Sequence, residues 1–226
     1  MLVSTLSRVI TIALALHETL LVLMLALPAH DIDREDASAR KERLGIIAQA
    51  ISEASMHATC SSQYALEDCR PLWPLRPMEL GVLLLTQAYA ESRLARNVHE
   101  GNCRPYECDP IRNATTGIVM HRARSLWQIH HITPIESEWH LMQGSDLQST
   151  TAAAWAAAKL LSRGYRACGS ISGAIASYAG VGSCHWSQAS LRARMYVSLR
   201  ERASRLERQT EEPPSAPART RTSMRQ

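Results

Sequence analysis

The chain of 226 residues contains no Phe, and aromatic residues make up only 5% of it. A packed core must therefore consist of Leu, Ile, Val, Ala, Met and the five Trp. Hydrophobic residues make up 46% and charged residues 20%, which excludes a wholly disordered chain. Lys41 and Lys159 are the only lysines, so arginine carries almost all of the positive charge. The net charge of +4 is too small to indicate a nucleic-acid-binding protein.

The sequence also lacks the short motifs of several enzyme classes. It contains neither a G-x-S-x-G nucleophile elbow nor a glycine-rich phosphate-binding loop. The Cys and His residues between positions 103 and 140 do not have the C-x-x-C or H-E-x-x-H spacing of zinc sites. We therefore expect neither a metal nor another cofactor. At about 150 residues per domain the chain has room for one or two domains.

The six cysteines form three pairs of neighbours in the sequence. The simplest pairing is Cys60–Cys69, Cys103–Cys108 and Cys168–Cys184. Sequence alone does not select among the possible connectivities. Disulfides persist in oxidising compartments, so this pattern favours a secreted or periplasmic protein of the cell envelope.

An apolar stretch follows Arg8 near the N-terminus. It covers residues 9–27, is interrupted by His17 and Glu18, and ends before Ala29. A positive flank, an apolar stretch and a small residue are typical of a secretory signal peptide or a membrane anchor, which predicts membrane association through residues 9–27. The alternative is an amphipathic helix that packs on the body of the protein.

Helical spacing of apolar residues recurs along most of the remaining chain. It predicts helices over residues 33–55, 77–92, 150–162, 171–178 and 187–208. Pro77 suits the first turn of the second of these helices. The segment 93–118 contains several Gly and Pro and is predicted to be irregular, and short strand-like pieces occur only near residues 118–120.

The expected fold is therefore mainly α. Its predicted parts are a signal peptide or anchor over 1–29, an N-terminal helix and disulfide loop over 30–76, one helical domain over 77–209, and a disordered tail over 210–226. We expect this single domain to be a monomer.

Glu91 is the strongest candidate for a catalytic residue. It ends an apolar helix and shares a face with Leu84 and Ala88. Desolvation and the negative end of the helix dipole both disfavour a charged carboxylate there. A carboxylic acid that keeps its proton near neutral pH can protonate a leaving oxygen, as a glycosidase requires. The alternative is an exposed Glu at a helix end that pairs with Arg93 or Arg96.

Three segments resemble, in order, the motifs of soluble lytic transglycosylases and related lysozyme-like muramidases. Residues 88–94, AYAESRL, resemble the helix end in which a catalytic Glu is followed by Ser. Residues 125–129, SLWQI, resemble a Gly-Leu-Met-Gln-Ile-like segment, and residues 176–180, ASYAG, resemble an Ala-x-Tyr-Asn-x-Gly-like segment. The resemblance covers roughly residues 77–208 and implies a lysozyme-like helical domain.

The resemblance implies a role for each matching residue. Glu91 would be the general acid and then the base, and Ser92 would orient it or contact the substrate. Gln128 would line the sugar cleft. Tyr178 would hydrogen-bond near Glu91 and help to hold its proton. Trp127 stands in the position of Met and is a candidate for stacking on a sugar ring.

The sequence also departs from the family's pattern. Ser125 replaces the usual Gly, and Ala179 stands where Asn is expected. A hydrolase uses a second carboxylate to activate water, and Glu100, Glu107 and Asp109 lie in the long segment between the first two motifs. A lytic transglycosylase needs no second carboxylate, because the 6-hydroxyl of the sugar itself attacks.

The resemblance thus implies an enzyme that cleaves the β-1,4 bond between N-acetylmuramic acid and N-acetylglucosamine in peptidoglycan. Its partner would be the glycan strand, with no role for nucleic acid. Two alternatives stay open. One is a non-catalytic glycan-binding or structural module of a cell-wall or phage assembly, and the other is a membrane-linked interaction protein.

Overall fold

The computed structural model describes residues 2–29, 35–60, 71–180, 182–187 and 189–211. Most of these residues are helical, which confirms the predicted mainly α fold. The helices are α1 (Leu2–Leu25), α2 (Ala37–Ala58), α3 (Pro77–Ser92), α4 (Arg96–His99), α5 (Glu136–Trp139), α6 (Leu147–Cys168), α7 (Ile171–Ala179) and α8 (Ala189–Glu211). The predicted tail lies outside the described residues from position 212 onward.

Polar side chains fix the starts of several helices. Asp36 accepts hydrogen bonds from the first turn of α2, and Asp146 accepts one from the backbone N–H of Ser149 at 2.9 Å. Ser170 caps α7 through the N–H of Gly173 at 3.0 Å. Each cap satisfies a backbone donor that has no partner within the helix. The cap at Asp146 explains why α6 begins before the predicted residue 150.

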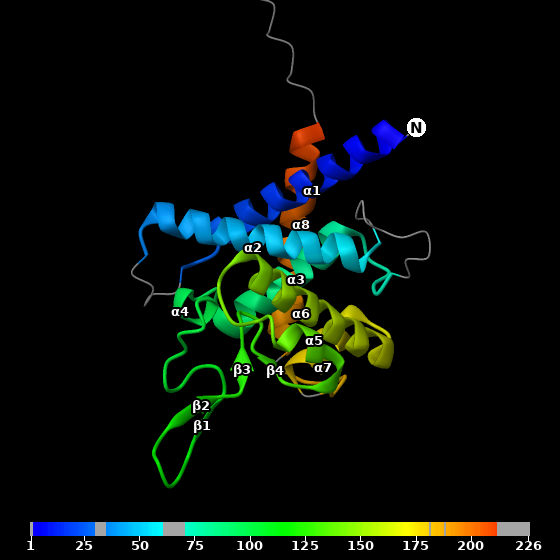
Figure 1. The fold of residues 1–226 in the computed structure, drawn as a ribbon. Coiled ribbons are helices and arrows are strands. Elements are labelled where there is room, and N and C mark those ends of the chain that lie inside the picture. The colour runs from blue at the N-terminus through cyan, green and yellow to red at the C-terminus, as the bar shows by residue number, and fades with distance from the viewer. Residues whose placement is uncertain (1, 30–34, 61–70, 181, 188, 212–226) are drawn as a thin grey trace, which may run out of the picture.

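The core surrounds α3, whose residues 80–88 are all buried. Helices α1, α2, α6 and α8 pack around it (Figure 1). Gly81 lies at the crossing with α1 and α2, where a Cβ atom would come within 3.1 Å of Leu16 and 3.4 Å of Leu20. The absence of a side chain at this position lets the helices approach closely, which places the C-terminal end of α3 at a fixed position.

Helix α1 packs against α2, α3 and α8. Its residues Leu16, Leu20, Leu23 and Met24 are buried in the common core. Residues 9–27 thus pack on the body of the protein as part of a helix, as the alternative to a signal peptide or membrane anchor describes. No helix in the described part of the chain is long and apolar enough to cross a membrane.

The segment predicted to be irregular contains a short helix and a hairpin, so that prediction was wrong in part. Strands β1 (Pro110–Arg112) and β2 (Val119–His121) pair antiparallel with Ile111 opposite Met120. Their turn forms because Asn113 Oδ1 accepts the N–H groups of Thr115 and Thr116. The hairpin projects from the body of the protein (Figure 1).

A second antiparallel pair consists of β3 (Ala123–Arg124) and β4 (Ile129–His130), which frame the second sequence motif. A 3₁₀ turn, Thr133–Ile135, follows β4.

Two of the expected disulfides are present, Cys103–Cys108 and Cys168–Cys184. The first closes a small loop at the base of the hairpin, and the second joins the end of α6 to the segment before α8. The third expected pair includes Cys69, which lies outside the described residues. The two bonds suggest an oxidising compartment.

Candidate functional site

An open groove of about 620 Å³ lies where the end of α3, the Cys103–Cys108 loop, the β3–β4 segment and the end of α7 meet. It brings together four of the five predicted site residues, Glu91, Ser92, Gln128 and Tyr178. Asp109 and His130 line it as well. Segments that are far apart in sequence therefore form one surface.

The end of α3 exposes Glu91 to this groove. Arg93 and Leu94 both have positive φ angles, 53° and 55°, so the chain leaves the helix directly after Ser92. The hydroxyl of Ser92 donates its proton to the carbonyl of Ala88 at 2.8 Å. Ser92 therefore offers a ligand only the lone pairs of its oxygen.

Glu91 forms an ion pair with Arg192 of α8. Both side chains are mostly buried, with 18% of Glu91 and 16% of Arg192 exposed. Arg192 also donates to Gln87 Oε1 at 3.3 Å, and its guanidinium lies 5.7 Å from the ring centre of Trp186. These contacts hold the guanidinium in place beside the carboxylate.

The ion pair changes the expected chemistry of Glu91. The sequence predicted an apolar surrounding that keeps the carboxyl neutral, or else a partner in Arg93 or Arg96. Instead, the partner of Glu91 is a guanidinium from the other end of the chain, that of Arg192. Arg96 pairs with Glu100 at 2.6 Å.

The second motif forms a tight turn with two residues in the left-handed region, Ser125 at φ 63° and Gln128 at φ 49°. Gln128 donates from its backbone N–H and from Nε2 to the carbonyl of Ser125, both at 3.1 Å. Glycine adopts this conformation without strain, whereas at Ser125 it costs about 1 kcal/mol of backbone strain energy. The replacement of Gly by Ser keeps this turn but makes it less stable.

Trp127 does not line the groove, so the prediction that it stacks on a sugar is not supported. Its side chain is fully buried, and Nε1 donates to the carbonyl of Leu84 at 2.9 Å. The ring therefore anchors the second motif to α3. The sequence could not distinguish this role from stacking, because both use a large aromatic ring with a polar edge.

Tyr178 connects the third motif to the second. Its hydroxyl donates to the carbonyl of Trp127 at 2.8 Å, whereas the resemblance implied a hydrogen bond near Glu91. Burial raises the pKa of Tyr178 well above its usual value, and the negative charge of Glu91 adds to this effect. Tyr178 thus keeps its proton and orders the groove wall.

The acidic residues of the long segment differ in position. Asp109 lines the groove and pairs with Arg122 at 2.6 Å and with His130 at 3.7 Å. Glu107 also lines it, but its carboxylate accepts from Asn97 Nδ2 and from the backbone N–H of Arg104. Asp109 is therefore the better placed of these two for chemistry.

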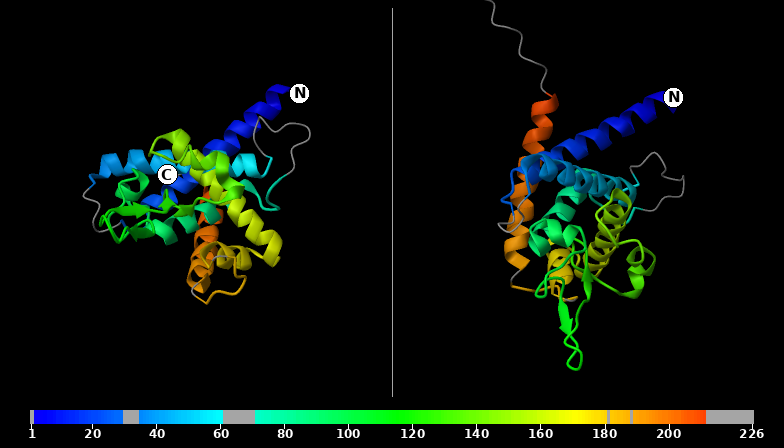
Figure 2. Two further views of the ribbon diagram at one scale, coloured as in Figure 1. Left: turned by 60° about the horizontal axis from the view of Figure 1, so that its bottom comes forward. Right: turned by 60° about the vertical axis from the view of Figure 1, so that its left-hand side comes forward.

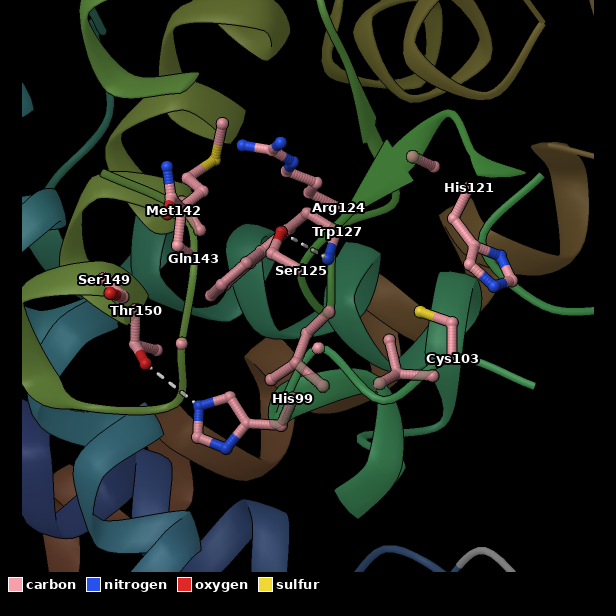
Figure 3. A pocket seen from close by; sticks show the side chains of 16 residues that line it. His99, Cys103, His121, Arg124, Ser125, Trp127, Met142, Gln143, Ser149 and Thr150 are labelled. Carbon is pink, nitrogen blue, oxygen red and sulfur yellow. Dashed lines mark hydrogen bonds between the residues drawn. The ribbon is translucent and has the colours of Figure 1, made fainter. Parts of the chain in front are cut away.

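A second cavity of about 320 Å³ lies beside β3 and the Ser125 turn (Figure 3). His99 lies on its wall, with Nε2 at 2.9 Å from Thr150 Oγ1. Since that hydroxyl donates to the carbonyl of Asp146, it accepts the proton of Nε2. Burial and the charge of Arg43 lower the pKa of His99 to about 4, so this imidazole is neutral. The sequence offered no signal for His99 among its nine histidines.

Within the ranges that the structure describes, His, Cys, Asp and Glu side chains form no group of three that could hold a metal ion. Comparisons of the chain with protein-family models, with curated proteins and with solved structures found no match. The chemistry of the groove is therefore inferred from its own residues.

Proposed function

We propose that the groove binds a glycan strand of peptidoglycan and that Glu91 cleaves the β-1,4 bond between N-acetylmuramic acid and N-acetylglucosamine. One observation supports this most directly: Glu91, Gln128 and Tyr178, which carry the resemblance to lytic transglycosylases in the sequence, line a single groove. The disulfides fit the same proposal, because this substrate lies in the cell envelope and the enzyme would be secreted or periplasmic.

In this mechanism Glu91 first gives a proton to the glycosidic oxygen while the bond to C1 of the muramyl sugar breaks, which produces an oxocarbenium-like transition state. Glu91 then accepts the proton of the 6-hydroxyl as that oxygen attacks C1 and closes a 1,6-anhydro ring. The carboxylate that forms in the first step is the species that Arg192 stabilises.

Hydrolysis is the second candidate reaction, and the position of Asp109 favours it. Asp109 lines the same groove as Glu91 and pairs with two basic groups, Arg122 and His130. A second carboxylate in this position can take a proton from water as the water attacks C1.

Mass spectrometry of digested peptidoglycan tests the proposal. Anhydro-muramyl ends indicate a transglycosylase and reducing ends a hydrolase. Glu91→Gln should abolish product formation, whereas Glu100→Gln, which removes an acid that pairs with Arg96, should not. Equal digestion by the wild type and Glu91→Gln would contradict the proposal. Binding of glycan without cleavage by the wild type would indicate the non-catalytic module instead.

A further inference from the structure

Helix α1 exposes several apolar side chains on the side that faces away from the core. Its inner face is buried against the core, as described above, and its outer face exposes Ile10, Leu14, Val22 and Leu25. At 100° per residue, Ile10, Leu14 and Leu25 fall within an arc of about 60°. Val22 lies about 60° further round, and the exposed Glu18 lies between Leu25 and Val22. We call these four residues the outer stripe of α1. The outer face of a helix on a soluble protein is normally polar, so the outer stripe indicates a contact with an apolar phase.

The position of α1 in the molecule separates the outer stripe from the groove. The N-terminal half of α1 extends beyond the body, and the C-terminal end of α8 projects on the same side (Figure 2). The β1–β2 hairpin lies at the opposite end (Figure 1), and the disulfide loop at its base borders the groove. A surface that binds α1 and the end of α8 would leave the groove accessible.

The charge of α8 indicates what kind of surface this is. Arg192 faces inward and pairs with Glu91, whereas Arg200 is exposed and pairs with Glu79. Arg194, Arg205 and Arg208 are exposed along the outside of the same helix, and the exposed Glu201 lies on the same side between them, which leaves this side with net positive charge. A second copy of the chain seated across this end would bring exposed arginines close to one another, which costs energy. An anionic bilayer offers both an apolar interior and a negative surface.

We propose that this end of the protein docks on an anionic lipid bilayer. The outer stripe of α1 lies in the interface between head groups and acyl chains, and Arg205 and Arg208 near the C-terminal end of α8 contact the head groups. The helix lies along the membrane rather than crossing it, which agrees with its lack of a stretch long and apolar enough to span one. Vesicle binding does not depend on the proposed cleavage of peptidoglycan.

Co-sedimentation of the full chain with vesicles tests the docking. The vesicles contain phosphatidylcholine alone or phosphatidylcholine with about one third phosphatidylglycerol. The wild type should bind the anionic vesicles, and salt should weaken this binding. Arg205→Gln together with Arg208→Gln should weaken it about 30-fold, since each arginine contributes about 1 kcal/mol near such a surface.

Leu14→Asp tests the outer stripe directly. The Leu14 side chain is 59% exposed, so its replacement costs little packing, and vesicle binding should fall at least tenfold. Ile118→Asp is the matched control, because Ile118 is 61% exposed on the hairpin at the other end, and it should bind as the wild type does. Thermal melting establishes that both variants fold.

Three outcomes would overturn the docking. They are no binding of the wild type to anionic vesicles, equal loss in Leu14→Asp and Ile118→Asp, and a dimer in solution that Leu14→Asp dissociates. The last would show that a second copy covers the outer stripe. Glu91→Gln should bind vesicles as the wild type does, so a failure of the proposed cleavage stays separate from a failure of docking.

Discussion

The ion pair of Glu91 and Arg192 makes a quantitative prediction about stability. Arg192→Met removes the ion pair, the hydrogen bond to Gln87 and the contact with Trp186. Breaking a fully buried pair costs about 3–5 kcal/mol, and losing an exposed pair costs about 0–1 kcal/mol. Because both side chains retain a small exposed fraction, we expect the free energy of unfolding to fall by about 2 kcal/mol.

Glu91→Gln separates the charge from the other contacts of Arg192. The amide keeps the shape of the side chain but loses its charge, so the free energy of unfolding should fall by about 1 kcal/mol. The double variant should be about as stable as Arg192→Met alone, because the second change removes an interaction that the first has already broken. The expected coupling energy is therefore about 1 kcal/mol.

Denaturant unfolding of the four proteins, followed by far-ultraviolet circular dichroism, measures this cycle. If the losses of unfolding free energy in the two single variants add up to the loss in the double variant within about 0.3 kcal/mol, the pairing of these side chains in solution is refuted. The same variants bear on the mechanism. Arg192→Met should lower kcat more than it changes KM, because Arg192 stabilises the carboxylate that forms during the reaction. A change confined to KM would place Arg192 in substrate binding.

Three further predictions concern single contacts of the site. Tyr178→Phe leaves the carbonyl of Trp127 without its donor, and unfolding measurements should show a loss of about 1–2 kcal/mol; an unchanged stability would contradict the hydrogen bond. Ser125→Gly should stabilise the protein by up to about 1 kcal/mol in the same assay, because glycine tolerates the positive φ, and a clear loss would show that the Ser side chain outweighs the strain. The pKa of His99 is about 4 in the folded protein, below that of a histidine in the unfolded chain. The neutral His99 therefore contributes fully to the free energy of unfolding above about pH 6.5, and this contribution is lost as the pH falls toward 4, by about 3 kcal/mol in all. Unfolding of His99→Gln across this pH range should lack that part of the loss, and identical pH dependence would contradict it.

Local patterns in the sequence predicted most of the helices. Apolar spacing predicted α2, α3, α6, α7 and α8, because a helix that packs on a core carries its own periodic signal. Only a strand-like piece near residues 118–120, which overlaps β2, was predicted. The pairing of β1 with β2 was missed because these strands are only three residues long and largely exposed, so they show no alternation of apolar and polar residues. A pattern of that kind needs one buried face.

The site residues that lie within the three sequence motifs were predictable, whereas a residue brought in by packing from outside them was not. The order of the three motifs indicated that Glu91, Gln128 and Tyr178 serve one site, and the structure places them in one groove. Arg192 was not predicted as the partner of Glu91. In the sequence it is one of six arginines on an amphipathic helix, and only the packing of α8 against α3 turns it inward while Arg194 stays exposed.

Trp127 connects all three parts of the groove. Its indole donates to α3, which carries Glu91, and its carbonyl accepts from Tyr178 of α7. The next residue, Gln128, lines the groove itself. The position of the motifs relative to one another therefore depends on a fully buried residue that does not line the groove, which makes Trp127 a positioning residue.

Trp127→Phe distinguishes positioning from stacking on a sugar. It removes the indole donor and part of the buried ring, so the free energy of unfolding should fall by about 2–4 kcal/mol. The affinity for a soluble chitooligosaccharide, measured at a temperature where the variant is folded, should change much less than turnover, since no face of the ring reaches the groove. If Trp127 stacked on a sugar instead, the variant would keep its stability and lose affinity. That result would require the second motif to open away from α3, because the ring is fully buried while its Nε1 donates to the carbonyl of Leu84.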